Sequence, residues 1–117
     1  MKAKAYLTQV RKEYRNLREM RGRLAAEKDP GKQKELRELL KKAAAYYTGV
    51  LNAVWDTIEQ LEEEADQEVL VRKYVFLETG EEIAGEMNLS RSTVSKYHLR
   101  ALGRLQRILD GKGCDAA

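Results

Sequence analysis

The chain of 117 residues can form one compact domain, or a small domain joined to an extended element. Charged residues make up 35% of it and hydrophobic residues 43%, and this Lys/Glu/Arg/Leu/Ala-rich mixture with one proline favours long helices over sheets. No apolar run approaches the roughly 20 residues of a membrane span, nothing resembles a signal peptide, and the single Cys114 excludes an internal disulfide, so we expect a cytoplasmic protein.

The net charge of +3 hides a strong segregation of charge along the chain. Residues 1–28 carry nine cations and three acids, and residues 90–117 carry six and two. The intervening stretches are acidic, with five cations and eight acids in residues 29–64 and two and six in residues 65–89. For residues 1–28, a solvated helix face and a nucleic-acid contact explain the basic charge equally well.

The first predicted helix covers about 25 residues and carries a heptad seam. Its apolar side chains recur at intervals of three and four residues, interrupted by Arg21: Leu7, Val10, Tyr14, Leu17 and Leu24. Asp29, Pro30 and Gly31 end this pattern, because proline cannot continue a helix but suits the first turn of a new one that Asp29 can cap.

A second apolar seam follows over about 35 residues and consists of Leu36, Leu40, Ala43, Tyr47, Val50, Val54, Ile58, Leu61 and Ala65. The short connection predicts an antiparallel helical hairpin over residues 1–65. Two narrow stripes bury little apolar surface, so we expect the hairpin to act as an oligomerisation arm that forms a dimer. Tyr46, Tyr47 and Trp55 are the bulky candidates for that interface, and packing within the chain is the alternative explanation for them.

Residues 66–110 are predicted to form a compact helical domain, followed by a disordered tail over residues 111–117. Asp66 is the expected cap of a helix over residues 67–77, whose inward side chains are Val69, Leu70, Tyr74 and Leu77. A final helix is expected over residues 91–109, ended by a glycine, with a buried stripe of Val94, Ala101, Leu105 and Ile108. The predicted fold class is therefore all-α.

Residues 82–97, EIAGEMNLSRSTVSKY, have the spacing of a helix-turn-helix. A Thr-x-x-Glu capping box over residues 79–82 begins the first helix. A side chain larger than that of Ala84 would hold the two helices apart. Asn88 suits the turn because asparagine tolerates the left-handed backbone, and Ser90 can cap the second helix.

The outward face of the second helix carries hydroxyls and cations and no acid. This chemistry matches that of phosphates and base edges in a major groove. We therefore predict DNA contacts from Arg91, Ser92, Thr93, Ser95, Lys96 and Arg100. Arg91 is the best candidate for a bidentate contact with guanine, and Lys96 and Arg100 would add base or phosphate contacts.

Four groups of residues in this part of the chain fall at fixed offsets: Tyr74-Val75-Phe76, Glu82-Ile83-Ala84, Ser90-Arg91-Ser92-Thr93-Val94 and Arg100-Ala101-Leu102-Gly103-Arg104-Leu105. With them, residues 67–109 resemble region 4 of bacterial sigma-70 factors. The basic Lys-Ala-x-x-Tyr-Leu start and the coiled arms look like small phage and prophage transcription regulators. The resemblance implies a regulator that binds double-stranded DNA in a bacterial host cell, with RNA polymerase as a further candidate partner.

Two departures from the family limit what can be transferred. Nothing corresponds to sigma region 2, which melts the −10 element, so a complete sigma factor is not expected. Ser92 and Ser95 replace the longer polar side chains common in the family, so its base preference does not carry over to this chain.

Other functions compete with this prediction. A phage small terminase subunit also joins a helix-turn-helix to helical oligomerisation segments, and a polymerase-binding module would have little direct contact with DNA. An enzyme is not expected, because His98 is the only histidine and lies in mid-helix, and no glycine-rich phosphate loop is present. No catalytic residue, metal ligand or cofactor is predicted.

Overall fold

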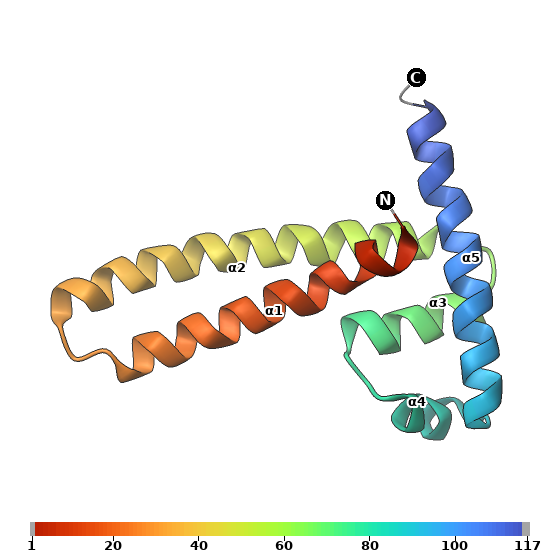
Figure 1. Ribbon diagram of the computed structural model, residues 1–117, viewed down its shortest axis with the longest axis horizontal. Coiled ribbons are helices and arrows are strands. Elements are labelled where there is room, and N and C mark those ends of the chain that lie inside the picture. The colour runs from red at the N-terminus through yellow and green to blue at the C-terminus, as the bar shows by residue number, and fades with distance from the viewer. Residues whose placement is uncertain (1, 116–117) are drawn as a thin grey trace.

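The computed structural model describes residues 2–115, with side chains described for residues 2–111, and shows an all-helical chain (Figure 1). The elements in chain order are α1 (Ala3–Ala26), α2 (Pro30–Glu59), α3 (Glu64–Leu70), the π-helical turn η1 (Val71–Val75), α4 (Gly80–Met87) and α5 (Arg91–Asp115). The predicted all-α class is confirmed, with a long antiparallel hairpin ahead of a helix-turn-helix unit. No helix in the described part of the chain combines the length and the apolar character needed to cross a membrane.

The hairpin turns at the predicted residues. Asp29 caps α2, because its Oδ1 accepts a hydrogen bond from the Gly31 amide at 3.1 Å, and Pro30 takes the first helical position. The Glu27 carboxylate accepts a hydrogen bond from the Asp29 amide at 3.1 Å, and its carbonyl accepts one from Gln33 Nε2 at 2.7 Å. These contacts fix the short connection and hence the antiparallel path of the two helices.

The main core lies at the base of the hairpin, where α1 and α2 meet the C-terminal helices (Figure 1). Its buried residues come from both halves of the chain: Ala3, Leu7, Val10, Val54, Ile58, Leu61, Leu70, Tyr74, Ala101 and Leu105. The base of the hairpin and the C-terminal helices thus share one core across the boundary predicted between residues 65 and 66. Folding therefore couples the arm to the domain that follows it.

The distal half of the hairpin buries fewer apolar side chains than its base. Leu17 is the one fully buried apolar residue there among the described residues, whereas the seam residues Leu24, Leu36 and Leu40 are half-buried. The radius of gyration of 17.4 Å exceeds the roughly 13 Å expected for a compact domain of this length. The hairpin therefore projects as an arm.

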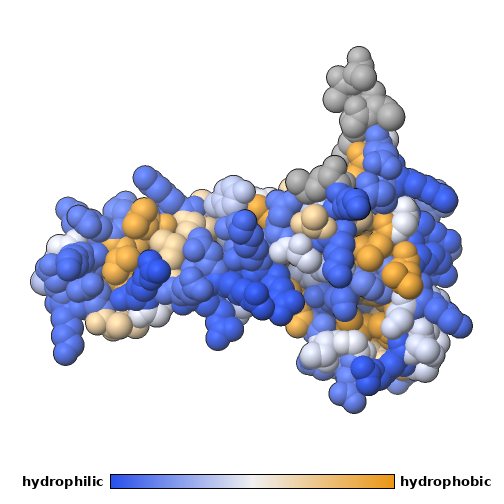
Figure 2. Space-filling view, in the orientation of Figure 1, coloured by the Kyte–Doolittle hydropathy of each residue, from blue (hydrophilic) through white to orange (hydrophobic). Residues whose placement is uncertain are grey.

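The three bulky aromatic residues of α2 have different surroundings. The Tyr47 ring lies 6.2 Å from that of Tyr14 on α1, and the Trp55 ring lies 6.2 Å from that of Phe76, so packing within the chain accounts for both. Tyr46 is 59% exposed. Figure 2 shows further hydrophobic side chains on the surface of the distal hairpin, surrounded by hydrophilic ones.

Helix α2 ends earlier than the sequence predicts. The apolar spacing continues to Ala65, but α2 ends at Glu59 and a turn precedes α3. Gln67 Nε2 donates hydrogen bonds to the carbonyls of Leu61 at 2.6 Å and of Glu59 at 3.4 Å, which satisfies groups that a helix end leaves free. Because Leu61 still enters the core from the turn, its apolar character alone did not reveal the break.

The predicted role of Asp66 as a helix cap is wrong. Helix α3 begins at Glu64, and Asp66 lies in its first turn, fully buried, where its carboxylate binds Arg100 and Arg104 of α5. Its partners are far away in sequence, so local spacing could not identify them. The helix then ends in η1 rather than running regularly to Leu77, which has a positive φ of 58°.

Helix α5 continues to Asp115, beyond the end predicted at Asp110-Gly111. A single glycine costs only about 1 kcal/mol in a helix interior, and Gly111 does not adopt the positive φ of a helix C-cap. Within the tail predicted to be disordered, residues 111–115 therefore continue the helix, and residues 116–117 lie outside the described part of the chain.

Candidate nucleic-acid interface

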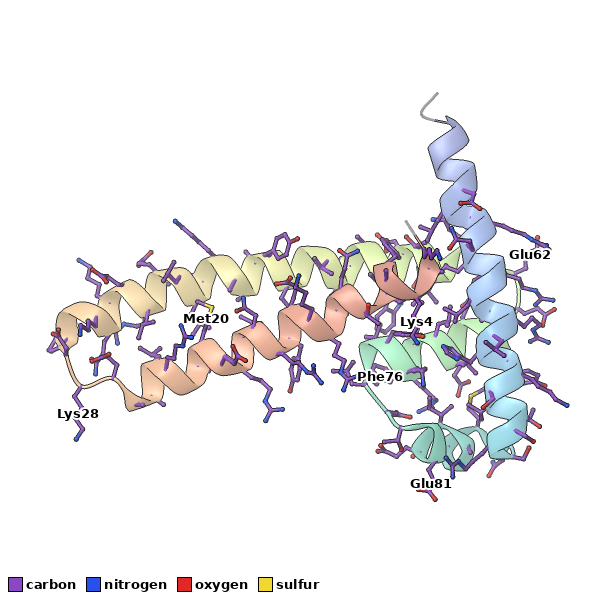
Figure 3. The ribbon with its side chains drawn as sticks, in the orientation of Figure 1. Lys4, Met20, Lys28, Glu62, Phe76 and Glu81 are labelled. Carbon is purple, nitrogen blue, oxygen red and sulfur yellow. The ribbon has the colours of Figure 1, made fainter. Side chains whose placement is uncertain are left out.

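Helix α4 begins with the predicted capping box. Thr79 Oγ1 accepts a hydrogen bond from the Glu82 amide at 3.2 Å, and Glu82 Oε1 accepts one from the Thr79 amide at 3.0 Å. Hydrogen bonding to the Thr79 amide, with a smaller contribution from the Thr79 side chain, holds the pKa of the Glu82 carboxylate below its usual value. Figure 3 shows Glu81, the neighbouring acid, at the outer edge of α4.

The turn between α4 and α5 has the predicted geometry. Asn88 adopts the left-handed conformation with φ 55° and ψ 44°, which asparagine tolerates better than most residues with a side chain. The Leu89 amide donates to the Ala84 carbonyl at 2.9 Å and closes the end of α4. Ser90 Oγ accepts a hydrogen bond from the Thr93 amide at 3.1 Å, so Ser90 caps α5 as expected.

A small second core holds α4 against the start of α5. Ile83 and Ala84 are buried against Val94, and Met87 and Leu89 pack around them. The methyl group of Ala84 lets the two helices approach closely, since close-packed interiors leave no space for a larger side chain. The turn, the cap and this core together make the start of α5 a rigid platform.

The outward face of this platform is open to solvent. Arg91, Ser92, Ser95 and Lys96 are exposed on the first turns of α5, and Thr93 is half-buried, with its Oγ1 2.8 Å from Ser90 Oγ. No described acid forms an ion pair with either cation of this face. The structure thus brings four of the six predicted site residues together on one exposed face, here called the recognition face.

Leu99 continues the recognition face by one turn and is 69% exposed. Sequence analysis did not select it, although its spacing of three and four residues from Lys96 and Ser95 places it on the same side of the helix. An exposed apolar side chain in this position suits contact with a thymine methyl group.

Arg100 lies four residues beyond Lys96 on α5, and its guanidinium binds Asp66 of α3 and Glu63, the residue before α3. Its Nη2 is 2.6 Å from Asp66 Oδ1 and 3.2 Å from Glu63 Oε2, and its Cζ lies 4.5 Å from the centre of the Tyr97 ring. Arg104 binds the same two carboxylates, and hydrogen bonding to Asp66 raises the pKa of Arg104 above its usual value. Sequence analysis missed this cluster, which anchors α5 to α3.

Behind the recognition face, His98 joins α5 to η1. Its Nε2 is 2.6 Å from the hydroxyl of Tyr74. Burial lowers the pKa of His98, as do the nearby charges of Lys73 and Lys4, and burial raises the pKa of Tyr74. The surroundings therefore favour the neutral form of the histidine, whose contact with Tyr74 links α5 to η1. In the described part of the chain, no group of His, Cys, Asp and Glu side chains is arranged to hold a metal ion.

The short helix α4 and the capped start of the long helix α5 are joined by a left-handed asparagine, and with the exposed polar face of α5 they define a helix-turn-helix domain. Residues 51–105, a little under half of the chain, match the family described as sigma-70, region 4. The match begins within α2, so it includes part of the base of the hairpin, and it covers residues 67–105 of the resemblance noted over residues 67–109. Neither a curated protein nor a solved structure matches the chain.

Proposed function

We propose that this protein is a transcription regulator of phage or prophage type that binds double-stranded DNA with sequence specificity in the bacterial cytoplasm. The observation that carries the proposal is the recognition face, whose two cations form no ion pair with any acid in the described part of the chain and stand on a well-packed helix start. The sigma-70 region 4 family is DNA-binding and non-catalytic, which favours this function over an enzyme. The phage assignment rests on the resemblance of the basic start and helical arms.

In this mechanism the start of α5 enters the major groove. Arg91 donates two hydrogen bonds to O6 and N7 of a guanine, a contact that contributes about 1–3 kcal/mol of discrimination against other bases. Lys96 and the hydroxyls of Ser92 and Ser95 contact neighbouring base edges or phosphates. The Arg91 and Ser92 amides at the start of α5 have no acceptor within the helix and are available to a phosphate, whereas the Thr93 amide donates to Ser90 Oγ. Arg100 stays on Asp66 and holds α5 in place.

Binding-site selection followed by titration of the selected duplex tests this mechanism. Arg91→Ala should weaken binding to the selected duplex by roughly 5- to 150-fold, the equivalent of about 1–3 kcal/mol, and should relax the preference at one base pair. Lys96→Ala should weaken binding as well. Arg107→Ala, which removes an exposed cation farther along α5, is the matched control. If Arg91→Ala and Lys96→Ala both bind as tightly as the unaltered protein, the recognition face is assigned wrongly.

We further propose that two copies of the chain pair through α2. Leu39 and Tyr46 are 52% and 59% exposed and lie one heptad apart, so they fall on one side of the helix. Beside Tyr46 lies a groove of about 350 Å³ whose lining is largely apolar: Tyr6, Gln9, Ala45, Gly49, Val50, Ala53 and Val54. Such a stripe fits a second helix, and a dimer would present two recognition faces to paired half-sites.

Two rival functions make different predictions for the same purified protein. A ring that assembles with a large ATPase partner would support a small terminase subunit. Tight binding to core RNA polymerase without DNA, together with unmeasurable binding to the selected duplex, would support a polymerase-binding module. Polymerase contact in addition to DNA binding is compatible with the regulator.

A further inference from the structure

We infer that α1 carries a second DNA-binding surface, which contacts phosphates beside those reached by the helix-turn-helix. The inference rests on the proposed function and extends it to a segment outside the sigma-70 region 4 match. The surface is here called the α1 cationic face and consists of Lys4, Thr8, Arg11, Arg15 and Arg18. Their spacing of four, three, four and three residues places them on one side of α1.

The α1 cationic face forms one wall of a cleft of about 630 Å³. The opposite wall comes from η1 and the chain that leads into α4: Lys73, Tyr74, Leu77, Glu78 and Thr79. Figure 2 shows the molecule hollowed between the hairpin and the α4 end, with strongly hydrophilic side chains along the hairpin side. In Figure 3, Lys4 lies where α1 approaches the C-terminal helices. The cleft therefore joins the N-terminal arm to the helix-turn-helix.

The cleft is strongly positive. Its lining includes five cations and one carboxylate, Glu78, whose charge is already matched by Arg72 at 3.2 Å. No ion pair joins any of the five lining cations to an acid among the described residues. Besides burial, the charges of Lys73 and Lys4 lower the pKa of His98 on α5. An unneutralised cluster of this kind attracts a polyanion.

The position of the cleft relates it to bound DNA. Thr79 caps α4 and also lines the cleft, so the start of α4 stands at its edge. In helix-turn-helix complexes the first helix crosses the sugar–phosphate backbone while the second enters the major groove. A strand that passes the start of α4 would next meet the α1 cationic face. From Lys4 to Arg18 this face extends about 21 Å at about 1.5 Å per residue, or roughly six base-pair steps at 3.4 Å.

The chemistry of the cleft favours DNA over an acidic protein partner. Protein interfaces are centred on buried apolar and aromatic side chains with the charges at the rim. Here five of the lining side chains are arginines and lysines, and the Arg18 Cζ lies 6.0 Å from the centre of the Tyr14 ring. Arginine is well suited to phosphates because its planar fork donates two parallel hydrogen bonds.

The test compares three variants whose altered side chains are all exposed. The first carries Arg11→Gln, Arg15→Gln and Arg18→Gln, and the second carries lysine at the same three positions. The control carries Lys34→Gln, Arg37→Gln and Lys41→Gln on α2, which changes the net charge equally but lies outside the cleft and on the side of α2 away from Leu39 and Tyr46. Each is titrated against the selected duplex and an unrelated duplex at several salt concentrations, after circular dichroism has confirmed its helix content.

The glutamine variant on α1 should bind both duplexes at least about tenfold more weakly, and its plot of log affinity against log salt should be shallower by about two to three units, because each lost phosphate contact removes about 0.9. The lysine variant should restore most of the slope, and the α2 control should stay within about twofold of the unaltered protein. Sequence preference should be unchanged, since phosphate contacts carry no base information.

The outcomes separate this inference from the proposed function. If the glutamine variant on α1 keeps the affinity and salt slope of the unaltered protein while Arg91→Ala loses the selected duplex, the α1 inference is wrong and the regulator stands. If the α2 control weakens binding as much as the α1 variant, total charge rather than the cleft is responsible, and the inference is also wrong. If the unaltered protein binds neither duplex, the proposed function fails and the inference fails with it.

Discussion

His98 illustrates, at the scale of a single residue, how the surroundings of a side chain set its chemistry. The residue type alone is compatible with a metal ligand or a catalytic base, yet here the ring is half-buried and bonded to Tyr74. Burial disfavours the charged imidazolium, and the charges of Lys73 and Lys4 add to this effect. Because folding lowers the pKa of His98, protonation of this residue opposes the packing of α5 against η1.

The stability of the fold should therefore depend on pH through His98. As the pH falls, His98 takes up a proton in the unfolded chain near its ordinary pKa of about 6.5, whereas in the folded chain it does so only at a lower pH. Between these two pKa values protonation favours the unfolded chain. The free energy of unfolding is therefore highest above the unfolded pKa and decreases as the pH falls toward the folded pKa. Urea unfolding at pH 7.5 and pH 5.5 measures the loss, and His98→Gln should reduce it. Tyr74→Phe should lower stability by about 1 kcal/mol at pH 7.5 but keep the pH dependence, since burial is its main cause. An equal pH dependence in His98→Gln would contradict this assignment.

Interactions between residues that are close in the sequence could be predicted, whereas those between distant residues could not. The capping box, the Asn88 turn and the Ser90 cap each involve partners within a few residues, so spacing identifies them. The partners of Asp66 are 34 and 38 residues away, and only the packing of α3 on α5 brings them together. Arg100 shows the consequence, because its place in the family motif gives no sign that a buried acid engages it.

At the scale of elements, the position of α5 depends on its anchor to α3. Asp66 accepts hydrogen bonds from both Arg100 and Arg104, and the two arginines share Glu63 at the surface. The Ala3 amide also donates to Gln106 Oε1 at 2.6 Å, so the start of α1 is tied to the same helix. The orientation of the recognition face therefore depends on the contacts of Arg100, Arg104 and Gln106, which lie farther along α5.

Asp66→Asn should test whether Arg100 acts through this anchor. Arg100 and Arg104 use different oxygens of Asp66, and asparagine replaces one of them with an NH2 group that cannot accept a hydrogen bond. The variant should therefore lower the free energy of unfolding by about 1–3 kcal/mol and weaken binding to the selected duplex. Arg100→Gln should weaken binding by a similar factor, and the double variant should be little worse than either single one, because both changes disrupt one cluster. Additive effects on DNA binding would instead show that Arg100 contacts DNA independently, as the sequence predicts.

At the scale of the whole molecule, the two helical arms were predictable in outline and not in detail. Heptad spacing identifies two long helices, and Asp29-Pro30-Gly31 identifies the connection, because these signals are local. The end of α2 at Glu59 is stabilised by hydrogen bonds from Gln67, and α5 continues to Asp115 because a glycine in a helix interior costs little free energy. The spacing of apolar residues indicates neither of these effects. The shared core at the base of the hairpin depends likewise on how the halves of the chain pack.

The distal arm leads to a prediction about assembly. Its apolar seam is only half-buried within one chain, and Leu39 and Tyr46 remain exposed beside a groove of small side chains. A second copy that covers this stripe would bury the apolar surface that the single hairpin leaves in water. The unaltered protein should therefore have twice the chain mass in solution at the concentrations used for DNA titration, measured by sedimentation equilibrium.

Tyr46→Glu places a charge in the proposed interface and should give a monomer, whereas Thr48→Glu, on the opposite side of the same helix, should remain a dimer. The dimer should select paired half-sites, whose centres are separated by about one helical turn of DNA or a multiple of it, roughly 34–36 Å. The Tyr46→Glu monomer should still bind a single half-site, with a shallower salt dependence, because each copy brings its own phosphate contacts. A monomeric unaltered protein that selects a single half-site would show that the hairpin has another role, while the recognition face on α5 would keep its own.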